Sequence, residues 1–153
     1  MGTTILWIHA AAGAVWIGAC ACFVIAGLAL APRLDEQRNF AISAAPKIDR
    51  LAILSAALLF LTGLANLASA GISRRFAFPT AFMIVLAIKI ALFIVMITMM
   101  RSSMKIGAVI RSVVARGRTD AVPGAMSRMV KAHAAIVAMG AVALMLGLWL
   151  MGT

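Results

Sequence analysis

The chain of 153 residues is 65% hydrophobic and has a mean hydropathy of +1.11. A soluble domain is nearer half apolar, so this composition excludes a water-soluble globular fold and predicts that lipid surrounds much of the protein. The formal net charge of +10 is typical of nucleic-acid-binding proteins. Here, however, the charge lies in loops between apolar segments and no nucleic-acid motif is present, so anionic lipid headgroups are the predicted partners.

Four apolar segments follow one another along the chain, covering about residues 4–31, 51–70, 79–100 and 129–151. At 1.5 Å rise per residue, each is long enough to cross a hydrocarbon core of about 30 Å as a helix. The first segment is too long for the apolar core of a signal peptide and has no basic leader, so we expect it to be retained. The sequence therefore predicts an all-α fold, with residues 1–153 forming one integral membrane domain, an up-down four-helix bundle.

The loop after the third apolar segment carries a helical pattern of its own. Apolar residues such as Ile106 and Ile110 recur at helical spacing, with arginines between them. This stretch is predicted either to continue the third helix into the cytoplasm or to lie along the headgroups. Asp120, Pro123 and Gly124 are predicted to form the turn that ends it.

Basic residues are divided unevenly among the loops. Eleven of the fourteen lysines and arginines lie in the first and third loops, whereas two lie in the second. The positive-inside rule therefore predicts that the first and third loops face the cytoplasm of a bacterial-type inner membrane, where they meet anionic headgroups. Both termini are then predicted to face outward, and Trp7 and Trp149 fall at that outer level, where aromatic rings prefer to lie.

His9 interrupts the first apolar segment, and a titratable side chain inside a membrane helix is costly. It shares one helical face with Gly13, Trp16 and Cys20, whereas Cys22 lies on another face. Because glycines let a neighbouring helix approach closely, we expect the His9 face to turn toward the bundle interior. His9 is then either a hydrogen-bonding core histidine or a ligand to a metal or haem.

Lys89 lies about ten residues into the third apolar segment, where an ammonium needs a polar partner, an aqueous cavity or an anionic ligand group. It shares a helical face with Met96 and Met100. The chain has eleven methionines, whose thioether sulfur suits Cu(I), although methionine is also an ordinary filler of apolar cores. His133, the second histidine, is predicted to lie near the cytoplasmic side, on the order of 20 Å from His9, so the two cannot ligate one haem iron.

Short motifs, taken in order, resemble the membrane domain of the copper resistance D (CopD-like) family. The sequence contains "HAAAGAVWIGACACF" with a later "AP", then "DRLAILSAALLFLTGLANL", then "LAIKIALFIVMITMM". The resemblance covers about residues 5–100 and implies copper uptake or copper handling in the membrane. The residues that match the family pattern are His9, Trp16, Gly18, Pro32, Arg50, Thr62, Gly63 and Lys89.

The same layout resembles, more weakly, the HemJ-type membrane protoporphyrinogen oxidases. Pro32 and Arg33 fit the "PR" that follows the first helix in that family. The chain departs from the pattern because it has no tyrosine and lacks the histidine expected after the third helix. This resemblance implies haem b or another porphyrin, with His9 as axial ligand and Lys89 or Arg33 on the propionates.

Three functions are therefore open, of which an enzymatic one is the less expected. The first is copper handling, the second is haem b binding or porphyrin oxidation, and the third is a non-catalytic accessory subunit of a larger membrane complex. The candidate copper ligands are His9, Met83 and Met151 at the outer side, Cys20 deeper, and Met96, Met100 and His133 toward the cytoplasmic side.

Overall fold

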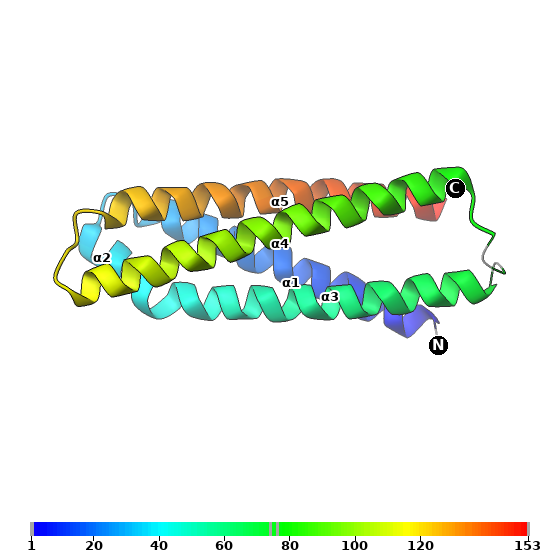
Figure 1. Cartoon of the computed structure of the whole chain (residues 1–153), viewed down its shortest axis with the longest axis horizontal. Coiled ribbons are helices and arrows are strands. Elements are labelled where there is room, and N and C mark those ends of the chain that lie inside the picture. Colours follow the sequence, from blue (N-terminus) through cyan, green and yellow to red (C-terminus); the bar gives the residue numbers. More distant parts are fainter. Residues whose placement is uncertain (1, 74, 76, 153) are drawn as a thin grey trace.

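A computed structural model describes residues 2–73, 75 and 77–152 of the chain, and these are almost entirely helical (Figure 1). Within those residues there is no β-strand. Four of the helices are long and apolar enough to cross a membrane, which confirms the predicted all-α four-helix membrane bundle. The elements are α1 (Gly2–Ala29), α2 (Leu34–Asn39), the π-helical η1 (Phe40–Ala44), α3 (Ala45–Ser73), α4 (Thr80–Ala115) and α5 (Val122–Gly152).

The prolines explain where several helices begin and end. Pro32 follows α1, and Pro79 directly precedes α4. Pro46 lies in the first turn of α3, directly after the π-helical η1. Because proline has no backbone N–H, it cannot donate the hydrogen bond that would continue a regular α-helix at this point. The predicted turn at Pro123 and Gly124 is wrong, because both residues belong to the first turn of α5. A proline is tolerated there, since the first N–H groups of a helix have no partner within it.

The helical pattern after the third apolar segment continues α4 as far as Ala115. Gly117 follows two residues after this end, and its φ of 75° lies in the left-handed region that glycine adopts freely. The N–H groups of Gly117 and Arg118 donate to the carbonyls of Val114 and Val113, at 2.9 Å and 3.1 Å. These two hydrogen bonds pair carbonyls that the end of the helix would otherwise leave without a partner.

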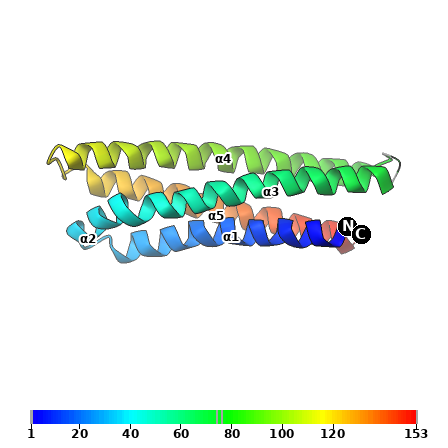
Figure 2. The same cartoon turned by 90° about the horizontal axis from the view of Figure 1, so that it is seen from below.

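Both termini lie at one end of the bundle, which we call the terminal end, and α2 lies at the other, the α2 end (Figures 1 and 2). Helix α1 packs along α3 and α5, and α4 packs along α5. Helices α3 and α4 touch one another much less and diverge toward the terminal end (Figure 1). The bundle is therefore open on one side.

Two clusters of buried side chains fill the interior. One contains Trp16, Cys20, Met96 and Met100. The other includes Phe40 of η1, and so lies nearer the α2 end. Large apolar side chains are exposed on all four long helices, as expected for a protein whose surface faces lipid. Trp7 and Trp149, near the terminal end, are among these exposed side chains.

Candidate functional site

The interior face predicted for α1 is confirmed. Trp16 and Cys20 are 1% and 0% exposed, whereas Cys22 is exposed. His9 is half-buried and reaches α3. The heptad-like spacing of these residues placed them on one side of a helix, and the close packing of α1 against α3 buries that side.

Thr62 orients the imidazole of His9. The distance from His9 Nδ1 to Thr62 Oγ1 is 3.0 Å, and the same hydroxyl donates to the carbonyl of Leu58 at 2.7 Å. Because the hydroxyl has a single proton, it accepts a hydrogen bond from Nδ1–H, and the free lone pair of the ring is on Nε2. A Cβ on Gly63 would lie 3.2 Å from His9 Cε1, so this glycine gives the ring its room. The ring of His9 is therefore held through Nδ1, which is the arrangement that an imidazole ligand would need to offer Nε2.

Lys89 is half-buried on α4 and points toward α5. A Cβ placed on Gly147 would lie 3.0 Å from Lys89 Nζ, so the ammonium rests against bare backbone. It also lies within electrostatic range of His9. Across residues 2–73, 75 and 77–152, no hydrogen bond or ion pair to this ammonium is found. The partner that a membrane-buried cation requires is thus not supplied by the described part of the chain.

Sulfur atoms gather near the middle of the bundle. Cys20 of α1 and Met96 and Met100 of α4 are 0%, 3% and 0% exposed and belong to one cluster. Met99, Met104 and Met139 are partly buried against it. The packing of α1, α4 and α5 thereby brings one thiol and several thioethers into an interior that excludes water.

A buried polar pair links α3 to α5. His133 Nε2 is 3.3 Å from Asp49 Oδ1, with the two side chains 0% and 6% exposed, although the atoms are not aligned as a hydrogen bond. His133 Nδ1 is 2.9 Å from the carbonyl of Met129 and 3.4 Å from Ser103 Oγ. Because a carbonyl only accepts, Nδ1 carries a proton. Nε2 faces Asp49 Oδ1, and the two side chains form an ion pair when the imidazole is protonated.

The ring of His133 also stacks on Phe23, with centroids 3.9 Å apart and planes at 6°. His133 therefore packs against Phe23 of the cluster nearer the α2 end. Its two nitrogens already face partners in the protein. The bundle thus separates the two histidines, with His9 toward the terminal end and His133 beyond the sulfur cluster.

The other predicted site residues are scattered. Met83 is 49% exposed and lies beside the opening between α3 and α4, and the side chain of Met151 lies outside the described residues. Arg33 is exposed at the α2 end, where it pairs with Glu36 at 3.2 Å. No three His, Cys, Asp or Glu side chains of the described residues come together as a metal-binding group.

Sequence reasoning missed Asp49 and Ser103. Asp49 lies just before the apolar segment predicted at 51–70, but α3 already begins at Ala45. Ser103 lies just beyond the segment predicted at 79–100, but α4 continues past it. The helical pattern that continues to Ile110 was the signal that Ser103 lies inside a long helix, whereas no such pattern marked Asp49.

Comparisons with protein-family models, curated proteins and solved structures found no match for the chain. The likeness to the copper resistance D family and to the HemJ-type oxidases therefore rests on the sequence motifs alone. A function must be inferred from the side chains that the bundle brings together.

Proposed function

We propose that the protein takes up copper, as Cu(I), across a bacterial-type inner membrane. The observation that carries this proposal is the burial of Cys20, Met96 and Met100 in one cluster. Thiol and thioether sulfur are soft ligands, which suit Cu(I) better than the hard cations that prefer oxygen. A thiolate and Cu(I) together are electrically neutral, and binding would release the thiol proton. Neutrality favours passage of the ion through an apolar interior.

His9 supports the proposal as a ligand nearer the terminal end. Its Nδ1–H donates to Thr62, which leaves Nε2 to bind a metal. Met83 and Met151 are proposed to assist there, and His133 to act toward the α2 end. We further propose that both termini face away from the cytoplasm, because eleven of the fourteen basic residues belong to the first and third loops.

Retention of Cu(I) by the purified protein tests the proposal. The protein in detergent is loaded with Cu(I) under reducing, oxygen-free conditions, washed with a Cu(I) chelator, and analysed for bound metal. We expect stoichiometric copper in the wild type and loss of most of it in Cys20→Ser. Cys22→Ser is the matched control, because it removes the same atom two residues away on the exposed face of α1.

A second pair of variants tests the thioethers. Met100→Leu removes a sulfur that is 0% exposed, whereas Met145→Leu removes one that is 70% exposed. Copper retention should fall in the first and stay unchanged in the second. The proposal is wrong if the wild type retains no copper, or if Cys20→Ser and Met100→Leu both retain as much as their controls.

Binding of haem b or another porphyrin is the second candidate, and the orientation of His9 favours it. An imidazole whose Nδ1–H is hydrogen-bonded is the usual form of an axial ligand, and Lys89 is near enough to His9 to interact with it electrostatically. An absorption spectrum separates the candidates. A Soret band that persists in Cys20→Ser would assign the ligand to His9, whereas bound copper without a Soret band supports copper handling. Neither ligand would favour an accessory subunit of a membrane complex.

A further inference from the structure

A polar depression lies on the outer face of α4 and has a volume of about 300 Å³. The residues that line it are Thr98, Arg101, Ser102 and Lys105. Their spacing of three and four positions places them on one face of the helix, and all four are exposed. The buried residues Met96, Met100 and Ser103 lie on the other face of α4. The depression therefore opens away from the bundle interior.

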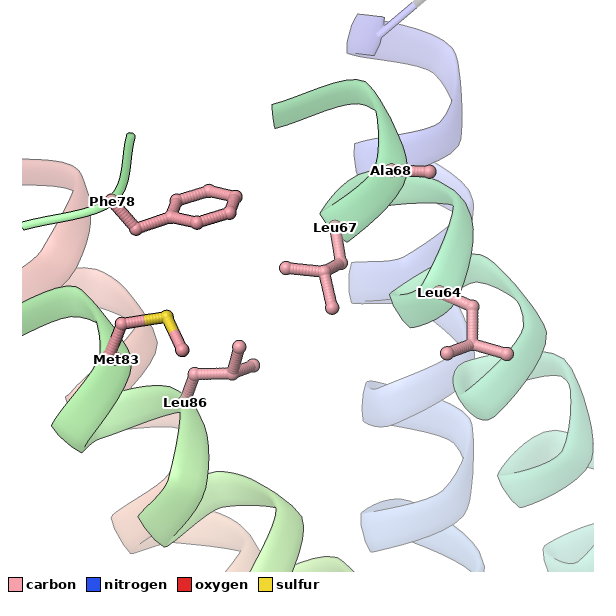
Figure 3. Close-up of a pocket in the computed structure, with 6 residues that line it drawn as sticks. All are labelled: Leu64, Leu67, Ala68, Phe78, Met83 and Leu86. Atoms are coloured by element: carbon pink, nitrogen blue, oxygen red, sulfur yellow. The ribbon is translucent and has the colours of Figure 1, made fainter. Parts of the chain in front are cut away.

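The apolar groove between α3 and α4 at the terminal end is a different kind of surface. Figure 3 shows side chains of α3 facing those of α4 and of the segment before it, across the gap. The groove has a volume of about 320 Å³, and the residues that line it are all apolar: Leu64, Leu67, Ala68, Phe78, Met83 and Leu86. The hydrocarbon of any lipid fits such a surface, so the groove selects no particular ligand. The depression on α4 has two cations and two hydroxyls, which are the groups that give a site specificity.

The depression lies at the level where hydrocarbon meets headgroups. About 30 Å of helix separates Arg101 from the start of α4 at Thr80, and this is the thickness of the hydrocarbon core of a bilayer. Within that length the exposed side chains of α4 include Ile90 and Ile94, at 50% and 58% exposure. The outer face of the helix thus changes from apolar to basic one hydrocarbon thickness from its start.

Exposed basic residues lie at the same level on two neighbouring helices. Ser103 of α4 and Asp49 of α3 lie 3.4 Å and 3.3 Å from His133 of α5, so these three residues mark one cross-section of the bundle. Arg50 directly follows Asp49, Lys131 precedes His133 by two positions, and both basic residues are exposed. Basic side chains at one depth on several helices are expected where the bundle enters the headgroups.

The protein offers the two cations of the depression no anion. The sequence contains four acidic residues, which are Asp35, Glu36, Asp49 and Asp120. Within the part of the chain that the structure describes, the ion pairs are those of Arg33 and His133. Arg101 and Lys105 therefore have no acidic partner among these residues. Two like charges four positions apart destabilise a helix by repulsion, and an anion bound between them would turn that repulsion into attraction.

The side chains of the depression supply donors that fit a phosphate. The guanidinium of Arg101 presents its N–H groups in a fixed fork that matches two phosphate oxygens, and Lys105 adds a compact positive charge. Thr98 Oγ1 donates to the carbonyl of Ile94 at 2.8 Å, so its proton is already used. Among the described residues no hydrogen bond to the hydroxyl of Ser102 is found, so this hydroxyl can donate as well.

We propose that Arg101, Ser102 and Lys105 bind the phosphate of one anionic phospholipid of the leaflet at the α2 end. Helix α4 runs from the terminal end to the α2 end (Figure 1), so lower residue numbers lie closer to the middle of the membrane. The acyl chains therefore extend from the depression along Ile94 and Ile90. Charge complementarity selects an anionic lipid over a zwitterionic one, whose own cation already compensates the phosphate. The site faces away from the proposed copper cluster, so the two proposals stand or fall independently.

Native mass spectrometry of the full chain, extracted from bilayers of phosphatidylcholine and phosphatidylglycerol, tests the site. The mass of each retained lipid identifies it, and we expect the wild type to retain phosphatidylglycerol preferentially. The double variant Arg101→Gln with Lys105→Gln should retain it on the order of thirtyfold less, the effect of two basic residues near an anionic membrane surface. Arg50→Gln with Lys131→Gln is the matched control, because it removes the same charge at the same level from two other helices. This control should behave like the wild type.

Ser102→Trp tests the depression while keeping both charges. The indole fills the space between Arg101 and Lys105, lies at a level that tryptophan favours, and should also lower the retention of phosphatidylglycerol. Helix content by circular dichroism establishes that each variant is folded, and Ser102→Trp carries the test if the double variant is not. The proposal is overturned if both variants retain the lipid as the wild type does, or if the matched control loses as much as the double variant. Equal retention of phosphatidylcholine, or retention of inorganic phosphate without a lipid, also overturns it.

Discussion

Replacing Asp49 with alanine should destabilise the bundle far more than the loss of an ordinary interhelical contact. Asp49 and His133 are nearly completely buried, and Nε2 and Oδ1 are 3.3 Å apart. When the imidazole is protonated the contact is an ion pair, and at an effective dielectric constant of 20 opposite unit charges at that distance attract by about 5 kcal/mol, which offsets the cost of removing them from water. Asp49→Ala removes the attraction but leaves His133 buried, and among the described residues its Nε2 has no hydrogen-bond partner.

Breaking a buried ion pair by deleting one partner costs about 3–5 kcal/mol. A typical interhelical hydrogen bond in a membrane protein contributes only about 0.6 kcal/mol. An ion pair between Asp49 and His133 and an ordinary hydrogen bond therefore predict clearly different losses of unfolding free energy. The free energy of unfolding can be measured by titrating the detergent-solubilised protein with SDS and following helix content by circular dichroism. The loss of unfolding free energy in Asp49→Ala should be about 3–5 kcal/mol, the value for a broken ion pair.

The double variant Asp49→Leu with His133→Leu is the informative companion. Replacing a buried pair with apolar side chains is often neutral or stabilising, so this variant should recover most of the stability lost in Asp49→Ala. Asp35→Ala, which removes an exposed carboxylate of α2, should cause no measurable change. A loss below about 1 kcal/mol in Asp49→Ala would refute the ion-pair reasoning and leave an ordinary polar contact.

Three further predictions follow from other contacts. Gly140→Ala would place a Cβ 2.8 Å from Ile17 and should cost about 1–3 kcal/mol of unfolding free energy, whereas Gly18→Ala meets nothing within 4 Å and should be neutral in the same SDS titration. Thr62→Val removes the acceptor of the His9 Nδ1–H, at 3.0 Å, and should lower the free energy of unfolding by about 0.6–1.7 kcal/mol. If His9 binds copper, the same change should lower copper affinity by about 10–100-fold in a chelator competition. A cysteine at Arg116 should resist a membrane-impermeant thiol reagent in intact cells, and labelling from outside would reverse the proposed topology.

The number and type of the long helices could be predicted because lipid leaves few alternatives. A backbone in hydrocarbon must satisfy its own hydrogen bonds, so each long apolar segment is a helix. The buried face of α1 could also be predicted, since the spacing of Trp16 and Cys20 matches the period of a helix. The positions of the helix ends were harder to predict from the sequence. Pro123 was taken as a helix breaker, but its effect depends on whether it falls in a first turn, which composition does not reveal.

The pairing of side chains from distant parts of the chain could not be predicted. Asp49 and His133 are 84 positions apart, and their contact depends on the rotation of α3 and α5 about their axes. The groove depends in the same way on the divergence of α3 from α4. In a membrane, apolar side chains face both lipid and protein, so hydrophobic patterning gives little information about which faces meet. The short α2 and η1 were missed because their few residues carry no long periodic pattern.

The two buried polar groups on opposite halves of the bundle are compensated in different ways, and this difference bears on their roles. His133 has Asp49, Ser103 and a backbone carbonyl around its ring, so packing of the protein alone accounts for its presence. Lys89 has a glycine opposite its ammonium and no acidic side chain at its end of the bundle. Because the described side chains do not compensate this ammonium as Asp49 compensates His133, we propose that Lys89 serves a ligand and not the fold.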